Sequence, residues 1–138
     1  CQSFVIGAAL VGLGLVVATP EGYGVDDAVL DRAAELGSAP EVVTDPEAAV
    51  EDADVVYTDV WVSMGQESER AEKLDVFSRG GFQVTEALLE DRLLMHCLPA
   101  HRGEEVTAAA LESENSIVWD QAENRLHAQK GLLTYLLD

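Results

Sequence analysis

The sequence has few cysteines, few basic residues and no hydrophobic run long enough to span a membrane. The only two cysteines among its 138 residues are Cys1 and Cys97. That number is too small for a disulfide-stabilised fold and is typical of a reducing, cytoplasmic environment. The 26 acidic residues far outnumber the 8 lysine and arginine residues, and the formal net charge at pH 7 is −18. A chain this acidic repels nucleic acid and anionic membranes, so neither is an expected partner.

Residues 4–18 are largely apolar. They follow no basic region, are shorter than the roughly 20 residues that cross a bilayer, and include three glycines. We therefore expect a buried helix that leads into a strand, and neither a signal peptide nor a membrane anchor. Because the chain begins without Met and enters this apolar stretch at once, we also expect it to be an internal part of a longer protein.

The acidic residues are spread over the whole length of the chain, and Lys73 and Lys130 are its only lysines. In the helical segments they alternate with apolar residues, which indicates a folded acidic surface rather than a disordered tail. Concentrated salt screens the repulsion between such charges, because the Debye length falls to about 3 Å at 1 M. We expect a salt-adapted protein whose stability rises with salt.

Short apolar runs and helical patterns alternate along the chain, and no hairpin signal separates any two of them. This alternation predicts the α/β class, with a parallel sheet covered by helices on both faces and one hydrophobic core. The expected strands are residues 15–19, 41–44, 54–60, 93–98 and 116–119. The expected helices are residues 2–13, 25–36, 46–52, 67–79, 85–91, 105–111 and 122–137. Asp45 and Pro46 supply the N-cap and the first residue of the third helix.

The last of these helices has its apolar residues crowded at its far end, from Leu132 to Leu137. Two interpretations follow. The helix closes the core of this chain, which the pattern alone favours, or it packs on a different body.

Asp59 stands at the end of the apolar strand 54–60. A carboxylate there is costly to bury without a cationic partner, and a ligand amine is one such partner. The loop from Ser63 to Gly65 adds a hydroxyl and backbone N–H groups, which bind carboxylates. Together they fit the amine and carboxylate of an amino acid. A capping aspartate before a tight turn explains the loop equally well.

The carboxyl ends of parallel strands are where α/β proteins bind ligands, and strand 93–98 ends in His96 and Cys97. With His101 these residues offer potential zinc ligands. Pro99 breaks the helix that would unite Cys97 and His101, and no second Cys or His pair has ligand spacing, so we expect no metal. Taken singly, His96 is more simply a hydrogen-bonded buried histidine, and Cys97 a small apolar residue.

Arg125 lies in the first turn of the last helix. Positive charge is unfavourable at a helix N-terminus, so a ligand contact is one explanation of this arginine. A surface ion pair with Glu123 or Asp120 is the alternative.

Three stretches together resemble the ornithine carbamoyltransferases. They are Asp-Val-Trp-Val-Ser-Met-Gly at residues 59–65, His-Cys-Leu-Pro at 96–99 and Ala-Glu-Asn-Arg-Leu-His at 122–127. The resemblance covers the whole chain: residues 1–121 correspond to the family's second, ornithine-binding α/β domain, which is Rossmann-like, and residues 122–138 to its last helix. The family carbamoylates the side-chain amine of ornithine with carbamoyl phosphate, giving citrulline and phosphate in arginine metabolism. The resemblance implies a cytoplasmic, trimer-based enzyme without a cofactor.

The resemblance implies that Asp59, Ser63 and Met64 bind the α-amino and α-carboxylate groups of L-ornithine. The Ser-Met-Gly loop is the motif most specific for ornithine. It disfavours the alternative that another amine, such as putrescine or an acylated ornithine, is the acceptor.

The resemblance also implies that Cys97 and the carbonyl of Leu98 lie beside the reacting amine and the carbamoyl group, and that Arg125 polarises the carbamoyl oxygen. A fixed guanidinium stabilises the negative charge that grows on this oxygen during attack. Cys97 is expected to act by position and hydrogen bonding, without a covalent intermediate.

Two parts of the family's site are expected upstream of Cys1: a Ser-x-Arg-Thr-Arg phosphate loop on the carbamoyl phosphate domain, and an asparagine that contacts ornithine. The family's last helix crosses back onto that domain, which accounts for the apolar end of the last helix here. We expect these 138 residues alone to be nearly inactive. The alternative is a stand-alone amino-acid-binding module without catalytic activity.

Overall fold

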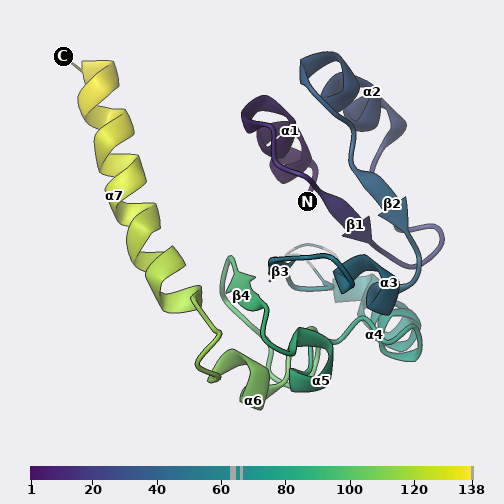
Figure 1. Ribbon diagram of the computed structural model, residues 1–138. Helices are drawn as coiled ribbons and strands as arrows, with labels where there is room; N and C mark the ends of the chain where they lie inside the picture. Colours follow the sequence, from purple (N-terminus) through teal and green to yellow (C-terminus); the bar gives the residue numbers. More distant parts are fainter. Residues whose placement is uncertain (63–64, 66, 138) are drawn as a thin grey trace. The chain divides into compact units, whose positions relative to one another are not determined.

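The computed structural model describes residues 1–62, 65 and 67–137 and contains two compact units (Figure 1). Unit 1 comprises Cys1–Asp52 and Ala71–Phe82, and unit 2 comprises Ala53–Arg70 and Gln83–Asp138. Each unit has its own cluster of buried apolar side chains, so two clusters replace the single core that we expected.

The strands that the structure describes form two parallel pairs. In unit 1, β1 (Val16–Ala18) pairs with β2 (Glu41–Val43), and in unit 2, β3 (Val55–Thr58) pairs with β4 (Leu93–His96). Parallel strands connected through helices confirm the predicted α/β class. Within the described residues the hydrogen-bonded strands are these two pairs rather than one sheet. The order of segments along a chain does not determine which strands hydrogen-bond, so the sequence could not predict this pairing.

In unit 1, α1 (Gln2–Val11) packs against α2 (Asp27–Leu36) around Val5, Ala9 and Ala33. The helices approach closely at Gly37, where an added Cβ would lie 2.4 Å from the carbonyl oxygen of Ala9. We expected α1 to be buried on all sides. Within the described residues it buries one stripe of small side chains, while Phe4, Leu10 and Val11 are exposed.

Two further helices belong mainly to unit 1. The short α3 (Pro46–Val50) begins as predicted, because the Asp45 carboxylate accepts hydrogen bonds from the backbone N–H groups of Glu47 at 3.0 Å and Ala48 at 3.4 Å. The 3-10 turn η1 (Glu67–Glu69) leads into α4 (Arg70–Arg79). On α4, Phe77 makes edge contacts with the rings of Tyr23 and Phe82.

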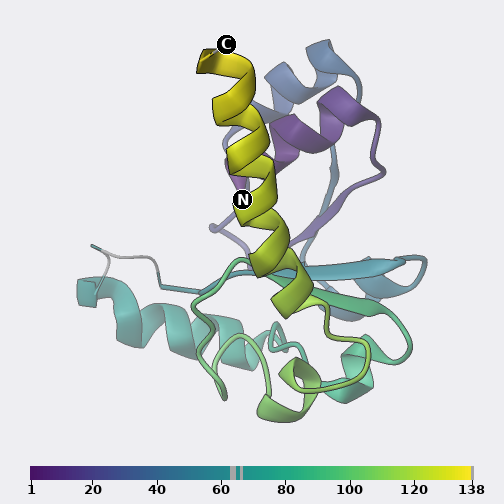
Figure 2. The ribbon, with the colours of Figure 1, turned by 90° about the vertical axis from the view of Figure 1, so that its left-hand side faces the viewer.

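In unit 2, α5 (Glu86–Leu89) and α6 (Ala108–Leu111) lie on one side of the β3–β4 pair, and α7 (Val118–Leu137) runs away from it (Figure 2). The cluster between them is larger than that of unit 1. Its buried members are Val84, Leu89, Leu94, Val106, Ala110, Leu111 and Val118. This cluster supports β4, whose end carries the predicted site.

The prediction of a last strand at residues 116–119 is wrong. Only Ser116 forms a bridge, with Leu94, and α7 begins at Val118, four residues before the start that we predicted. The β-branched sequence there favours a strand, but burial of Val118 and a helical hydrogen bond from Gln121 N to Ile117 O override that preference. Likewise, the helix expected at 105–111 is shortened to α6, because residues 105 and 106 pair with Val84.

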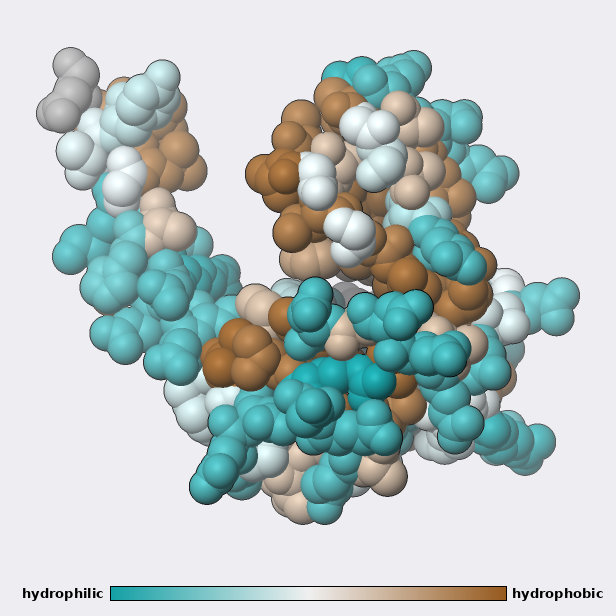
Figure 3. Space-filling view, in the orientation of Figure 1, coloured by the Kyte–Doolittle hydropathy of each residue, from teal (hydrophilic) through white to brown (hydrophobic). Residues whose placement is uncertain are grey.

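The middle and the far end of α7 expose large apolar side chains. They are Leu126, Leu132, Leu133, Tyr135, Leu136 and Leu137, and the hydrophobic end of this helix is visible in Figure 3. Of the helices in the described residues, none combines the length and the apolar character needed to cross a membrane.

Candidate active site

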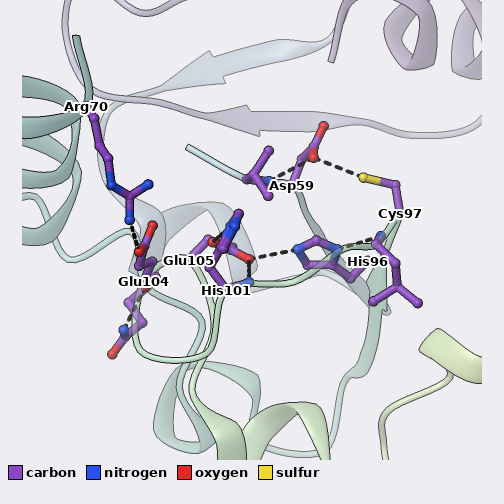
Figure 4. A network of polar contacts seen from close by, with 10 residues as sticks. Asp59, Arg70, His96, Cys97, His101, Glu104 and Glu105 are labelled. Atoms are coloured by element: carbon purple, nitrogen blue, oxygen red, sulfur yellow. Dashed lines mark hydrogen bonds and ion pairs between the residues drawn. The ribbon is translucent and has the colours of Figure 1, made fainter. Parts of the chain in front are cut away.

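Asp59 and Cys97 meet where β3 and β4 end. The parallel register pairs Thr58 with His96, so the next residue of each strand emerges at the same edge. The Cys97 thiol donates a hydrogen bond to Oδ1 of Asp59 at 2.9 Å, and the backbone N–H of Val60 donates to the same oxygen at 2.7 Å (Figure 4). Two of the residues singled out from the sequence, separated by 38 positions, therefore touch.

Burial and this contact together raise the pKa of the thiol. Burial, the hydrogen bond to Asp59 and the negative charge of that carboxylate raise the pKa of Cys97 to about 11, from an ordinary value of 9.0, although a hydrogen bond with Tyr57 acts in the opposite direction. Only the thiolate is a strong nucleophile. At neutral pH Cys97 is therefore a neutral hydrogen-bond donor, which agrees with a role by position rather than by covalent attack.

The sequence reasoning missed Tyr57 as a member of this edge. Its hydroxyl is in hydrogen-bonding contact with Cys97 and Gln121. Burial raises the pKa of Tyr57, the neighbouring Cys97 adds to the rise, and the hydrogen bond with Gln121 opposes it. A signal was present, because Tyr57 and Asp59 are two residues apart on a strand and thus point to the same face.

His96 is held from three sides. It is 1% exposed, its backbone N–H donates to the side-chain oxygen of Gln121 at 2.9 Å, and its Nε2 lies 3.1 Å from Oε1 of Glu105. Its Nδ1 accepts the backbone N–H of Leu98 at 2.8 Å. The simpler of our two interpretations, a hydrogen-bonded buried histidine, therefore describes His96, and with both ring nitrogens engaged it is not available to a metal.

Glu105 was not singled out from the sequence, yet it is fully buried. Its Oε1 accepts hydrogen bonds from the His96 ring and from the backbone N–H of His101 at 2.6 Å. Burial alone raises the pKa of a carboxyl group, but these hydrogen bonds outweigh it here, and the pKa of Glu105 lies below its ordinary value of 4.5. The buried carboxylate is therefore ionised at neutral pH.

Leu98 is the turning point of the chain after β4. Its φ of 53° is left-handed, a conformation that is disfavoured for a residue with a Cβ, and its peptide bond to Pro99 is cis. The hydrogen bond from its N–H to His96 fixes this backbone. Together with Cys97, Leu98 lines the pocket described next.

A pocket of about 570 Å³ opens next to Cys97. Its lining residues are Cys97, Leu98, Pro99, Ala100, Arg102, Leu111, Trp119, Ala122 and Arg125. Arg102 is paired with Glu112 at 2.5 Å. Arg125 has no carboxylate partner in the part of the chain that the structure describes, so the alternative ion pair with Glu123 or Asp120 is not formed there. Its charge is available to a ligand.

Two of the residues predicted to bind ornithine, Ser63 and Met64, lie outside the described residues. Asp59 does not line the pocket itself and is connected to it through the Cys97 thiol. The structure thus brings together Asp59, Cys97, Leu98 and the pocket that Arg125 lines.

One group of side chains has the composition of a metal site. His101, Glu104 and Glu105 each offer a ligand atom, and these atoms lie within 4.8 Å of one another. Glu104 is engaged by the guanidinium of Arg70. One carboxylate oxygen of this group therefore already has a cationic partner.

Comparison with known proteins gives a consistent result. The family model described as "Aspartate/ornithine carbamoyltransferase, Asp/Orn binding domain" matches residues 1–136. The ornithine carbamoyltransferase of Haloquadratum walsbyi is 63% identical over 138 residues, which cover 99% of this chain and 45% of that protein. The chain therefore spans slightly less than half the length of this curated relative.

Solved structures give the same picture. Ornithine carbamoyltransferase from Pyrococcus furiosus shares 53% sequence identity with a TM-score of 0.85, over 96% of this chain and 44% of that one. The anabolic ornithine carbamoyltransferase from Campylobacter jejuni shares 35% identity with a TM-score of 0.89, over 99% of this chain and 47% of that one. Both are similar to this chain along nearly its whole length.

Proposed function

Because this chain belongs to the aspartate/ornithine carbamoyltransferase family, we propose that it supplies the ornithine-binding half of an enzyme that makes citrulline. The reaction transfers the carbamoyl group of carbamoyl phosphate to the side-chain amine of L-ornithine and releases phosphate. The observation that carries this proposal is the contact between Asp59 and Cys97 beside a pocket that Arg125 lines. The product places the enzyme in arginine metabolism.

The ornithine-binding residues are Asp59, Ser63 and Met64. Asp59 is exposed and hydrogen-bonded only by a thiol and by one backbone N–H in the described residues, so an ammonium group can still approach its carboxylate. A charge-assisted hydrogen bond to the α-amino group of ornithine follows. Ser63 and Met64 belong to the loop that binds the α-carboxylate.

The reacting groups meet at Cys97, Leu98 and Arg125. The neutral side-chain amine attacks the carbamoyl carbon, a C–N bond forms, and the C–O bond to phosphate breaks. Negative charge grows on the carbamoyl oxygen, and the guanidinium of Arg125 stabilises it. Since the raised pKa keeps Cys97 protonated, the thiol donates or accepts hydrogen bonds at this point and forms no bond to carbon.

The rest of the enzyme is a carbamoyl phosphate domain that this chain does not contain. Residues 1–121 form the ornithine-binding domain, and the helix at 122–138 packs on the carbamoyl phosphate domain through its exposed apolar side chains. Burying such side chains is favourable by roughly 25 cal/mol per Å² of apolar surface. We expect the 138 residues alone to be nearly inactive.

The complete enzyme is cytoplasmic, salt-adapted and built on a trimer. The net charge of −18 supports salt adaptation, since molar salt screens the repulsion between like charges. The melting temperature of the chain should rise between low salt and 2 M KCl. A melting temperature that stays constant or falls would show that the protein is not salt-adapted.

The decisive experiment is a citrulline assay in high salt, with this chain alone and with the reading frame extended upstream of Cys1. Activity is expected only in the extended protein. A stand-alone binding module predicts ornithine binding by the short chain and no citrulline from either. Another acceptor predicts carbamoylation of putrescine or an acylated ornithine in competition with ornithine.

A substitution tests the role of Asp59. In the extended enzyme, Asp59→Asn removes the charge that pairs with the amine, and we expect the KM for ornithine to rise by about 100-fold, with a smaller change in the KM for carbamoyl phosphate. Asp54→Asn is the matched control, because Asp54 precedes the same strand at its opposite end. Equal KM values in the two variants would exclude Asp59 from the ornithine site.

A further inference from the structure

Glu105 lies nine positions after His96 and outside the three motifs of the site, yet the two side chains are among the most deeply buried of unit 2. His96 is 1% exposed and Glu105 is 0% exposed. Figure 4 shows the Glu105 carboxylate beside the His96 imidazole. The other ring nitrogen of His96 accepts the backbone N–H of Leu98. Burying a polar pair is costly, and hydrogen bonds to Oε1 of Glu105 offset part of that cost. Oε2 of Glu105 has no hydrogen-bond partner in the described part of the chain and lies 3.8 Å from Nδ1 of His101.

The backbone determines which ring nitrogen carries the proton. The N–H of Leu98 is a donor and lies 2.8 Å from Nδ1, so Nδ1 must be an acceptor. In the neutral ring the proton is therefore on Nε2, which donates to Oε1 of Glu105 at 3.1 Å. The ionised carboxylate selects this tautomer, because a carboxylate accepts and does not donate.

We propose that Glu105 and His96 are positioning residues that fix the pocket edge formed by Cys97 and Leu98. Glu105 holds His96 in the tautomer with the proton on Nε2, and His96 in turn holds the N–H of Leu98. The effect of this positioning on catalysis rests on the function proposed above. The tautomer of His96 does not depend on that function.

Leu98 needs this support more than its neighbours do. Its φ of 53° is left-handed, which disfavours a side chain with a Cβ, and its N–H donates to the imidazole of His96. Without an acceptor at Nδ1 the backbone is free to relax to an ordinary conformation. The relaxation would displace the Leu98 carbonyl and, through the shared peptide, Cys97.

The tautomer is measured directly on the 138-residue chain by ¹⁵N NMR of the histidine rings. We expect Nδ1 of His96 to be unprotonated and the ring proton to lie on Nε2. The Glu105→Gln variant should preserve this state, because a carboxamide oxygen can accept from both His96 and the His101 backbone. A proton on Nδ1 of His96 in the wild-type chain would overturn the proposal.

Two substitutions at His96 separate its two hydrogen bonds in the extended enzyme. The amide of His96→Asn lies near the place of Nδ1 and still accepts from Leu98, but it loses Glu105. The amide of His96→Gln lies near the place of Nε2 and still reaches Glu105, but it leaves the Leu98 N–H without its acceptor. Each variant loses the ring, so each is the matched control of the other.

We expect kcat in His96→Gln to be lower than in His96→Asn by about tenfold or more, with similar KM values for ornithine, because only the former loses the bond to the Leu98 backbone. Equal kcat values, or the reverse order, would refute the positioning role. If His96→Gln does not fold, the kcat of Glu105→Gln decides: a value within about threefold of wild type is expected, and a collapse would show that the charge of Glu105, not its acceptor geometry, matters. Absence of citrulline from the wild-type enzyme would refute the proposed function while leaving the tautomer result intact.

Discussion

Strands β2 and β3 are each followed closely by an aspartate, and the two carboxylates have different partners. Asp45 accepts two backbone N–H groups in the first turn of α3. Asp59 accepts one backbone N–H and the thiol of Cys97 from the neighbouring strand. The first is a helix cap within one segment of unit 1, and the second joins two strands of unit 2.

The residues that follow each aspartate explain the difference. Pro46 starts a helix directly after Asp45, so N–H groups without a helical partner face its carboxylate. Residues 60–62, which the structure describes directly after Asp59, belong to no helix, and Oδ1 of Asp59 accepts its second hydrogen bond from Cys97, 38 positions away. A carboxylate with few local donors is one that a ligand can use.

The largest expected effect is a difference in stability between the two pairs of strands. Leu94 in β4 is 0% exposed, whereas Val17 in β1 is only partly buried. We expect Leu94→Ala to cost about 3 kcal/mol and Val17→Ala about 1 kcal/mol. Hydrogen exchange of the strand amides measures each pair of strands separately. Similar losses of protection in β1 and β4 would mean that the two units are equally well packed.

The second prediction compares the rates at which two thiols, those of Cys97 and Cys1, are alkylated. With a pKa of about 11 instead of 9.0, Cys97 has an approximately 100-fold smaller thiolate fraction at pH 8, so iodoacetamide should modify it far more slowly than the exposed Cys1. Asp59→Asn removes the negative charge next to Cys97 and should accelerate its modification severalfold, whereas Asp45→Asn should not. Peptide mass spectrometry follows both cysteines in one sample. Rapid alkylation of wild-type Cys97 would contradict the raised pKa.

Local signals in the sequence were sufficient for much of the fold. The cap at Asp45 followed from Asp-Pro, the parallel pairs from the alternation of elements, and the positions of Asp59 and Cys97 from two apolar runs that end in polar residues. Each of these features depends on residues close to one another along the chain or on one general rule about parallel strands.

Features that depend on distant contacts were missed. Residues 116–119 have the composition of a strand, but burial of Val118 against β4 and the contacts of Gln121 favour a helix. Glu105 appeared to be one acidic residue among many, and its role follows only from its burial against His96. Charge patterns do not distinguish a buried carboxylate from an exposed one. The roles assigned to the site residues remain predictions.

A third effect is the pH dependence that the buried carboxylate adds to unit 2. The pKa of Glu105 is lower in the folded chain than its ordinary value of 4.5, so its contribution to stability is complete above that pH and is lost as the pH falls through the folded value. Urea midpoints between pH 7 and pH 3 should fall less steeply for Glu105→Gln than for wild type. Glu104→Gln is the control for removing a neighbouring charge. If the urea midpoint falls equally steeply with pH in Glu105→Gln and in the wild type, the lowered pKa of Glu105 is contradicted.

The smallest expected effect is the loss of stability when Asp45 or Asp59 is substituted. Asp45→Ala removes the acceptor of two helical N–H groups and should cost about 1 kcal/mol, whereas Asp45→Asn, which keeps an acceptor, should cost only a few tenths. Asp59→Ala should change stability by less than about 0.5 kcal/mol, because it caps no helix and the freed N–H of Val60 is near solvent. Urea unfolding measures all three. A loss of about 1 kcal/mol for Asp59→Ala would favour the alternative in which this carboxylate stabilises a tight turn. An unchanged stability would support the proposal that this acid serves the Cys97 thiol and a ligand amine rather than the stability of the fold.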